Sequence, residues 1–276
     1  MVMSVNTNVG AQIALQNLNA TNAQLATTQN RINTGKTVSS AKDNGAIWAI
    51  AQGQRAEIGA LNAVKQSLDR GVAAVDVALA AGETVSDLLL QMKEKALAAT
   101  DASLTTSARS ALNEDFKALR DQIASVTTNA EFNGINLLET GATGFQALAN
   151  AQGTSTLTVG AEVMALGSTT VSVATTQSID TLTKAAASLT AVSNSIDAVS
   201  GALARLGTKS KALSTHITFV GKLSDALESG VGNLVDADLA KESAKLQALQ
   251  TKQQLGVQAL GIANQTPQLV LSLFRS

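Results

Sequence analysis

Mostly hydrophobic residues recur every three and four positions from Leu182 to Leu227, and the spacing is unbroken. An α-helix nearly closes on itself every seven residues, so these positions share one narrow face of a single long helix. At 1.5 Å per residue this helix would be about 70 Å long, and its apolar face predicts packing against other long helices. One column of the pattern holds Leu182, Leu189, Ile196, Leu203, Ser210, Ile217 and Ser224, and the other holds Ala185, Val192, Val199, Leu206, Leu213, Val220 and Leu227.

Three more helices are predicted before the middle of the chain. The first spans Ser4 to Asn33, with an apolar column at Ala11, Leu18, Leu25 and Ile32 and a polar column at Asn22 and Gln29. The second begins after residue 45 and has a heptad stripe in which Gly71 and Gly82 fill the missing steps, where another backbone can come close. The third runs from about Thr106 to Thr127 and is capped by Ser107 or Thr105. The apolar stripes are Leu61, Val64, Leu68, Val75, Ala78, Val85, Leu89, Met92, Ala96 and Ala99 in the second helix, and Leu112, Phe116, Leu119, Ile123 and Val126 in the third.

Irregular segments separate these helices. Residues 34–45 are rich in Ser, Gly and Asn, which indicates a break. From Gly141 to Ser178 the stretches TLTVG and TTVSVAT alternate polar and apolar residues, which predicts one or two short hairpins at the tip of a helical rod. Gly230 and Gly232 mark the end of the long helix, and a last helix then follows to the C-terminus. Its columns are Leu239, Leu246, Gln253, Leu260, Pro267 and Phe274, and Leu249, Gly256, Ala263 and Val270.

Composition agrees with a mainly α fold. The chain has 276 residues, one proline and no cysteine, and its 45% hydrophobic content includes only 2% aromatics. Compact cores use bulky aromatic side chains to fill their centre, whereas Ala, Leu, Val and Ile suit thin seams between helices. We therefore expect a long coiled-coil-like rod, formed by the N- and C-terminal halves, with a small central β-hairpin region.

The net charge and the scarcity of reactive side chains exclude several classes of function. A net charge of −1 gives no basic field for nucleic acid and no polybasic face for anionic lipid. No apolar run reaches the length of a membrane span, and the first residues do not read as an ordinary secretory signal. His216, the single histidine, flanks a helix stripe; no residues have metal-ligand spacing, and no Gly-rich loop forms a phosphate cradle. We expect no catalytic, metal or cofactor site and no enzyme activity.

Both ends of the chain carry the motifs of one known protein family. The N-terminal match is SVNTNVGAQIALQNLNATN, followed by RINTGKTVSSAKDNGA with Arg31, Gly35, Ala41 and Asp43 at signature positions, and by FNGINLL at residues 132–138. The C-terminal match is DADLAKESAKLQALQTKQQLGVQALGIANQTPQLVLSLF. Together they cover about the first 138 and the last 95 residues. The chain thus resembles bacterial flagellin, and because both ends match in order and at the expected distances from the termini, the resemblance is specific.

The resemblance implies a subunit of the extracellular flagellar filament, which serves swimming motility. Residues 1–33 and 239–276 would form the inner shell, 34–45 a spoke, 46–138 and 181–228 the rod, 139–180 a short surface insert, and 229–238 a linker. Implied partners are further copies of the chain, alone or with other flagellins, the flagellar cap, hook–filament junction proteins and an export chaperone, with delivery by the flagellar type III system. No nucleic acid or membrane is implied.

The resemblance also assigns roles to residues of the predicted seams. The polymerisation interface is expected to include Leu18, Leu25, Ile32, Leu246, Leu249, Leu260, Val270 and Phe274. The spoke would use Arg31, Gly35 and Asp43. Rod packing would use Leu61, Leu68, Leu89, Phe116, Ile196, Leu203, Leu213 and Leu227.

Two alternatives remain open at this point. A hook–filament junction protein shares terminal helices of this kind, although the short middle and the match at both ends favour flagellin. An amphipathic membrane-binding or translocator protein would also carry heptad helices. The polar faces of the terminal helices carry Gln, Asn and Thr rather than Lys and Arg, which disfavours a membrane surface.

Overall fold

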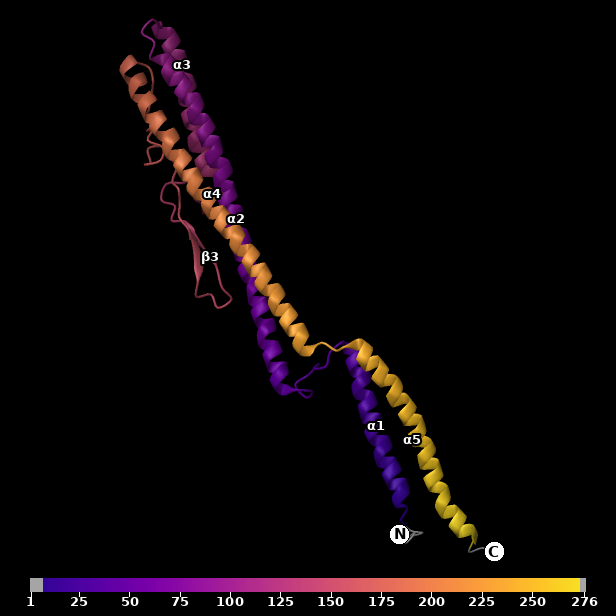
Figure 1. The fold of residues 1–276 in the computed structure, drawn as a ribbon. Coiled ribbons are helices and arrows are strands. Elements are labelled where there is room, and N and C mark those ends of the chain that lie inside the picture. Colours follow the sequence, from indigo (N-terminus) through magenta and orange to yellow (C-terminus); the bar gives the residue numbers. More distant parts are fainter. Residues whose placement is uncertain (1–6, 274–276) are drawn as a thin grey trace. The chain divides into compact units, whose positions relative to one another are not determined.

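The computed structural model describes the backbone of residues 7–273 and the side chains of residues 7–265. The fold is mainly α, as predicted (Figure 1). Its helices are α1 (Val9–Thr34), α2 (Gly45–Ala99), α3 (Thr106–Asn129), α4 (Leu182–Val235) and α5 (Leu239–Leu273). Its short strands are β1 (Glu131–Phe132), β2 (Ile135–Asn136), β3 (Phe145–Leu148) and β4 (Thr156–Val159). The chain forms two compact units, one from Glu57–Asp225 and the other from both ends, up to Ala56 and from Ala226.

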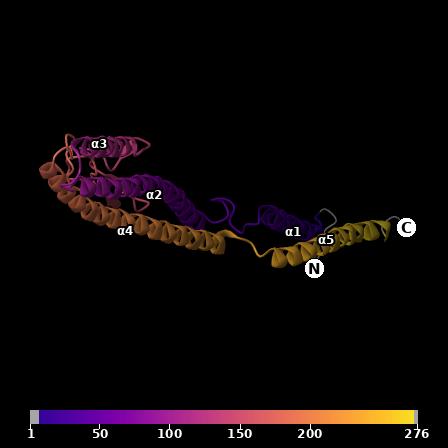
Figure 2. The ribbon, with the colours of Figure 1, turned by 90° about the horizontal axis from the view of Figure 1, so that it is seen from above.

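Helix α2 supplies the centre of the unit Glu57–Asp225. In Figure 2 it is seen between α3 and α4, which run beside it. Every residue of its predicted stripe is buried, which confirms the heptad pattern. Of the residues expected to pack the rod, Leu61, Leu68, Leu89, Phe116 and Leu213 are buried, and Ile196, Leu203 and Leu227 are half-buried. Thr105 caps α3 by accepting a hydrogen bond from the N–H of Ala108.

In α4 one predicted column is correct and the other is displaced by one position. The residues from Ala185 to Val220 in the second column are buried. The first column is at most half-buried, and its first residue, Leu182, is 45% exposed. The column that is buried instead consists of the small residues Ser188, Ser195 and Ala202. Both serines form hydrogen bonds with the extended segment before α4. This segment therefore occupies the space where a larger side chain was expected.

Gly71 and Gly82 lie where other parts of the unit approach α2 closely. An added Cβ at Gly71 would lie 2.9 Å from the ring atom Cε2 of Phe145. At Gly82 it would lie 2.7 Å from Leu203 Cδ2 and 3.2 Å from Met164 Sδ. The close approach predicted at both glycines is therefore present, but side chains make it rather than a backbone.

The central β-structure differs from the expectation. β4 coincides with the predicted TLTVG strand and pairs antiparallel with β3, which the pattern did not predict. The stretch 169–175 forms no strand beyond an isolated bridge between Leu166 and Val171. The hairpin does not cap a tip: Ser67 of α2 bonds to the N–H of Leu148, and Figure 1 shows the hairpin running alongside the helices. Burial of Ala147 and Val159 at this interface explains the position.

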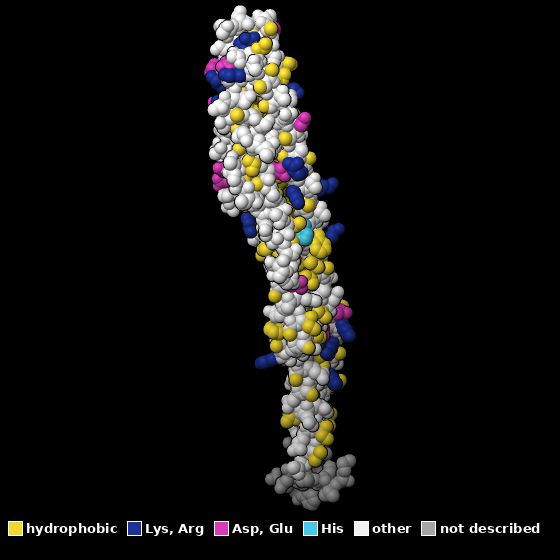
Figure 3. Space-filling view, turned by 90° about the vertical axis from the view of Figure 1, so that its left-hand side faces the viewer, with side chains coloured by type: hydrophobic (Ala, Val, Ile, Leu, Met, Phe, Trp, Pro, Cys, Tyr) yellow, Lys and Arg dark blue, Asp and Glu magenta, His cyan; other side chains and the backbone are white. Residues whose placement is uncertain are grey.

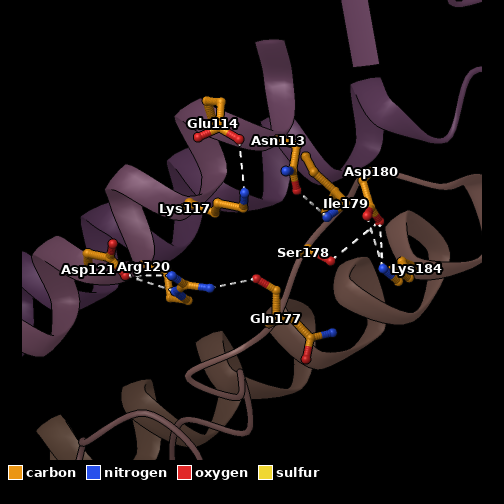
Figure 4. A network of polar contacts seen from close by, with 10 residues as sticks. All are labelled: Asn113, Glu114, Lys117, Arg120, Asp121, Gln177, Ser178, Ile179, Asp180 and Lys184. Carbon is orange, nitrogen blue, oxygen red and sulfur yellow. Dashed lines mark hydrogen bonds and ion pairs between the residues drawn. The ribbon is translucent and has the colours of Figure 1, made fainter. Parts of the chain in front are cut away.

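A polar network fastens the start of α4 to α3 (Figure 4). Asn113 Oδ1 accepts a 2.8 Å hydrogen bond from the N–H of Ile179, and Arg120 Nη1 donates to the carbonyl of Gln177. The Gln177 side chain in turn donates to Ser188 Oγ. The extended chain before α4 thus satisfies its backbone groups with side chains from both helices.

The long helix α4 continues beyond the predicted boundary. We expected it to end near residue 228, but it passes through Gly230 and Gly232 and ends at Val235. Its last carbonyl accepts a 2.7 Å hydrogen bond from the N–H of Thr37, and Val235 is buried. These contacts offset the cost of about 1 kcal/mol that each glycine imposes on a helix. The connection to α5 shortens to residues 236–238.

Candidate assembly interface

Helices α1 and α5 form an antiparallel pair from opposite ends of the chain (Figure 1). Each helix turns one face to the other. On α1 the least exposed positions are Ala11, Ala14, Leu18, Thr21, Leu25, Thr28 and Ile32, and on α5 they are Glu242, Leu246, Leu249, Gln253, Gly256, Leu260 and Ala263. The three-and-four spacing is that of a coiled-coil seam. Small and polar residues are frequent in it, so the seam buries little apolar surface for its length.

Six of the eight residues expected at the polymerisation interface lie in this seam. Leu249 is buried, and Leu18, Leu25, Ile32, Leu246 and Leu260 are half-buried. Their described contacts are therefore within one chain, and a role between copies stays a prediction. The side chain of Val270 and the whole of Phe274 lie outside the described residues.

The polar column of α1 is one position away from where we placed it. Asn22 and Gln29 are exposed, whereas Thr21 and Thr28 are buried in the seam. Both threonines follow Ala14 at seven-residue spacing, a signal that the sequence carries. Glu242 was also missed. A carboxylate is rarely buried in a seam unless it is paired, and its partner Arg31 comes from the other end of the chain.

Polar contacts join the two helices at both ends and in the middle of the pair. Asn8 Nδ2 donates to the carbonyl of Ala263 at 2.8 Å, and Gln253 Nε2 donates to Asn22 Oδ1 at 2.7 Å. At the other end of the pair, Arg31 Nη1 donates to Glu242 Oε1 at 3.1 Å. Asn8 also accepts from the N–H of Ala11 and so caps α1.

Arg31, Gly35 and Asp43, expected in the spoke, have distinct local roles. Arg31 belongs to the last turn of α1. Gly35 ends that helix with φ of 68°, a left-handed conformation that favours glycine, and its carbonyl accepts from the N–H of Ala237 at 2.9 Å. Asp43 stands just before α2 and organises the turn that precedes it.

Asp43 Oδ2 accepts four hydrogen bonds of 2.9–3.2 Å from the backbone N–H and hydroxyl groups of Ser39 and Ser40. These donors, the Ser39 hydroxyl first among them, hold the pKa of the Asp43 carboxyl below its ordinary value. The carboxylate therefore closes the turn in its ionised form.

The faces of α1 and α5 outside the seam carry large apolar side chains. Leu255 is 58% exposed and Ile262 is 67% exposed, and their seven-residue spacing places them on one face of α5, opposite the seam. Val9, Ile13 and Leu15 of α1 and Val257 of α5 are exposed as well. Figure 3 shows hydrophobic side chains on the surface of this pair, toward the lower end of the view.

Charge is nearly absent from the same surface. Residues 9–30 of α1 and residues 253–273 of α5 contain no Lys, Arg, Asp or Glu. Asn, Gln and Thr provide the polar groups between the apolar side chains. A surface of this composition is suited to close packing, since it buries no charge.

The side chains of residues 7–265 include a histidine with a structural contact and no candidate metal site. His216 Nε2 bonds to the carbonyl of Ala149 at 2.7 Å, and the ring lies 5.7 Å from that of Phe219, so the histidine holds the β3–β4 hairpin tip against α4. No group of three or more His, Cys, Asp or Glu in this part of the chain is placed to hold a metal ion. Among the described helices, none combines the length and apolar character needed to cross a membrane.

Comparison with known proteins matches both ends of the chain to family models. Residues 5–143 match the bacterial flagellin N-terminal helical region, and residues 189–274 match the bacterial flagellin C-terminal helical region.

Relatives match over nearly the whole length. The chain is 56% identical to flagellin FljK of Caulobacter vibrioides over 272 residues, covering 99% of this chain and 98% of that protein. It is 37% identical to a flagellin of Brucella melitensis, covering 99% of each. A solved structure of a putative flagellar hook-associated protein from Vibrio parahaemolyticus has a similar fold, with a TM-score of 0.56 at 16% identity, covering 70% of this chain and 100% of that one.

Proposed function

Because this chain belongs to the bacterial flagellin family, it is a structural subunit of the extracellular flagellar filament, and we propose that α1 and α5 carry the contacts between its copies. In this proposal, residues 1–33 and 239–276 form the inner shell of the polymer. Residues 46–138 and 181–235 form the surrounding rod, residues 34–45 and 236–238 connect the two, and residues 139–180 face outward.

The observation that carries the proposal is the exposed apolar face of α5. Leu255 and Ile262 point away from the seam, so α1 cannot cover them. Paired helices that bury one face and leave a second apolar face exposed are marginally stable in water. A neighbouring copy covers that face in the assembled polymer, and the absence of charge on it allows the neighbour to pack closely.

Two variants separate the seam from the outer face. Leu260→Asp places a carboxylate in the half-buried seam, and we expect it to break the helix pair and abolish polymerisation. The double variant Leu255→Lys, Ile262→Lys changes only exposed positions, so it should block polymerisation while α1 and α5 still pair. Leu255→Met with Ile262→Leu is the matched control, because it keeps both positions apolar.

Polymerisation is measured by sedimentation of filaments grown on seeds, and folding of the unit Glu57–Asp225 by circular dichroism. Filaments of normal yield from the double lysine variant would show that copies do not meet through this face of α5. Loss of polymer in the Met/Leu control would show that the effect is not one of charge.

We further propose that the outer apolar faces are covered before assembly by an export chaperone, and that the flagellar cap and hook–filament junction proteins contact the same terminal helices. Delivery by the flagellar type III system fits this plan, since a chain with such faces needs protection until it reaches the growing end. A chaperone that binds the unmodified chain should bind the double lysine variant more weakly and the Met/Leu control equally well. Equal binding of all three chains would place the chaperone elsewhere.

A further inference from the structure

The ion pair between Arg31 and Glu242 is incomplete in the single chain. Arg31 Nη1 uses only one carboxylate oxygen, and the side chains are 33% and 10% exposed. Glu242 Oε2 is buried and has no hydrogen-bond partner among the described residues. The same is true of Thr28 Oγ1, three residues before Arg31 on the face of α1 that meets α5. A buried donor, the Thr28 hydroxyl, and a buried acceptor, Glu242 Oε2, thus both lack a hydrogen-bond partner among the described residues.

Thr28 differs from the other threonines of its helix. Thr21, Thr27 and Thr34 each donate their hydroxyl to the carbonyl four residues earlier. The Thr28 hydroxyl makes no such bond, although the side chain is fully buried. Buried hydroxyl groups are almost always hydrogen-bonded, either to protein or to an ordered water.

We propose that Arg31, Glu242 and Thr28 form a polar lock that sets the register of α1 against α5, with the Thr28 hydroxyl donating to Glu242 Oε2 directly or through one buried water. The proposal rests on the pairing of α1 with α5 in the assembled filament. It adds the residues that decide which turn of one helix faces which turn of the other.

Apart from the hydrogen bonds of Asn8 and Gln253, the rest of the seam specifies register weakly. Its small and aliphatic residues repeat every seven positions, so a slip of one heptad places similar side chains opposite one another. At the lock the same slip would bring Leu249 or Val235 opposite Arg31 and leave the buried Glu242 carboxylate without its cation. Arg31 in the last turn of α1 and Glu242 in the first turn of α5 also suit the dipoles of their own helices.

The natural chain has no cysteine, so an introduced pair reports the register directly. A Cβ at Gly256 would lie 3.9 Å from Leu18 Cβ, a separation that suits a disulfide. Leu18→Cys with Gly256→Cys is therefore the register reporter. Leu18→Cys with Ala263→Cys reports a slip of one heptad, because that pair is about 10 Å apart in the observed register.

Each reporter is combined in turn with Arg31→Gln, Glu242→Gln and Thr28→Val. Lys252→Gln, an exposed charge on α5, is the control for the loss of a charge. Chains are assembled alone and diluted into cysteine-free chain, then oxidised, and intrachain disulfides are quantified by peptide mass in the polymer and in the soluble fraction. Dilution keeps disulfides between copies rare.

We expect the ratio of register to slipped disulfide to fall at least about tenfold in Arg31→Gln and Glu242→Gln, and to fall less in Thr28→Val. The control should keep the ratio of the unmodified background. An unchanged ratio in the three lock variants overturns the proposal, and so does loss of both disulfides, which would mean that the residues are needed for pairing rather than for register. Failure of the background to form the register disulfide in polymer would instead overturn the pairing on which the proposal rests.

Discussion

The side-chain oxygen of Asn113 in α3 accepts a 2.8 Å hydrogen bond from the backbone N–H of Ile179, which lies 66 residues further along the chain. Asn113 is only 5% exposed, and Ile179 is fully buried. The bond fixes the point at which the extended segment turns into α4, so it determines where the long helix begins relative to α3 (Figure 4).

Removing this bond should destabilise the unit Glu57–Asp225. Asn113→Ala leaves the buried N–H of Ile179 without an acceptor, which costs about 1–3 kcal/mol and is only partly offset by the better helix propensity of alanine. Urea unfolding followed by circular dichroism measures the change. Glu114→Ala, at the neighbouring exposed position, should change stability by less than about 0.5 kcal/mol. Equal effects of both variants would contradict a special role for Asn113.

Two glycine substitutions should change stability in opposite directions. Gly82→Ala places a methyl group against Leu203 and the fully buried Met164, and the overpacking should exceed the gain in helix propensity, with a net loss of about 1 kcal/mol. Gly207→Ala in α4 meets no atom within 4 Å and should gain up to about 1 kcal/mol. Thermal unfolding of the two variants compares them directly. A stabilising Gly82→Ala would show that the α2–α4 contact can relax.

Acid should open the turn before α2. The pKa of Asp43 lies below its ordinary value of 3.8, so the carboxylate stabilises the folded turn fully above about pH 4. That stabilisation is lost as the pH falls through the lowered pKa. We expect amide exchange of Ser39 and Ser40, corrected for the intrinsic pH dependence, to become less protected below that range. Asp43→Asn should remove this step, and an unchanged step would assign it to another group.

Limited proteolysis should distinguish the soluble chain from the polymer. The seam of α1 and α5 contains Thr21, Thr28, Gln253 and Gly256, which bury too little apolar surface to offset the ordering of two long helices. We expect both termini of the soluble chain to be cut back, leaving a resistant core near Glu57–Asp225. In the polymer the same bonds should resist. Termini as resistant as the core in the soluble chain would contradict this.

Periodicity predicted most of the helices because their packing repeats with the same period. The stripe of α2 and the column from Ala185 to Val220 in α4 are buried as expected, since long neighbouring helices contact them at every turn. The exceptions occur where a helix meets an irregular segment. Ser188 and Ser195 are buried because their hydroxyls form hydrogen bonds with the extended segment before α4. A pattern of hydrophobic residues does not predict contacts with such a segment.

At the candidate interface, too, periodicity predicted the regular positions but not the contacts between distant parts of the sequence. Seven-residue spacing correctly placed Leu246, Leu249 and Leu260 on the inner face of α5. It did not identify the pairing of Arg31 with Glu242, because those residues come from opposite ends of the chain and local sequence does not relate them. Neither could it predict β3, which pairs with β4 and packs its Phe145 ring against Gly71, a residue far away in the sequence.

The uncharged stretches of α1 and α5 have a consequence for a polymer built from identical copies. A lysine or glutamate at a contact between two copies needs an opposite charge on the facing surface, which identical copies supply only where both charges are placed to match. The side-chain amides of Asn and Gln carry a donor and an acceptor together, so two identical amide-rich surfaces can bond in either direction. Residues 9–30 and 253–273 thus present a self-complementary chemistry, for which the correct partner is simply another molecule of the same sequence.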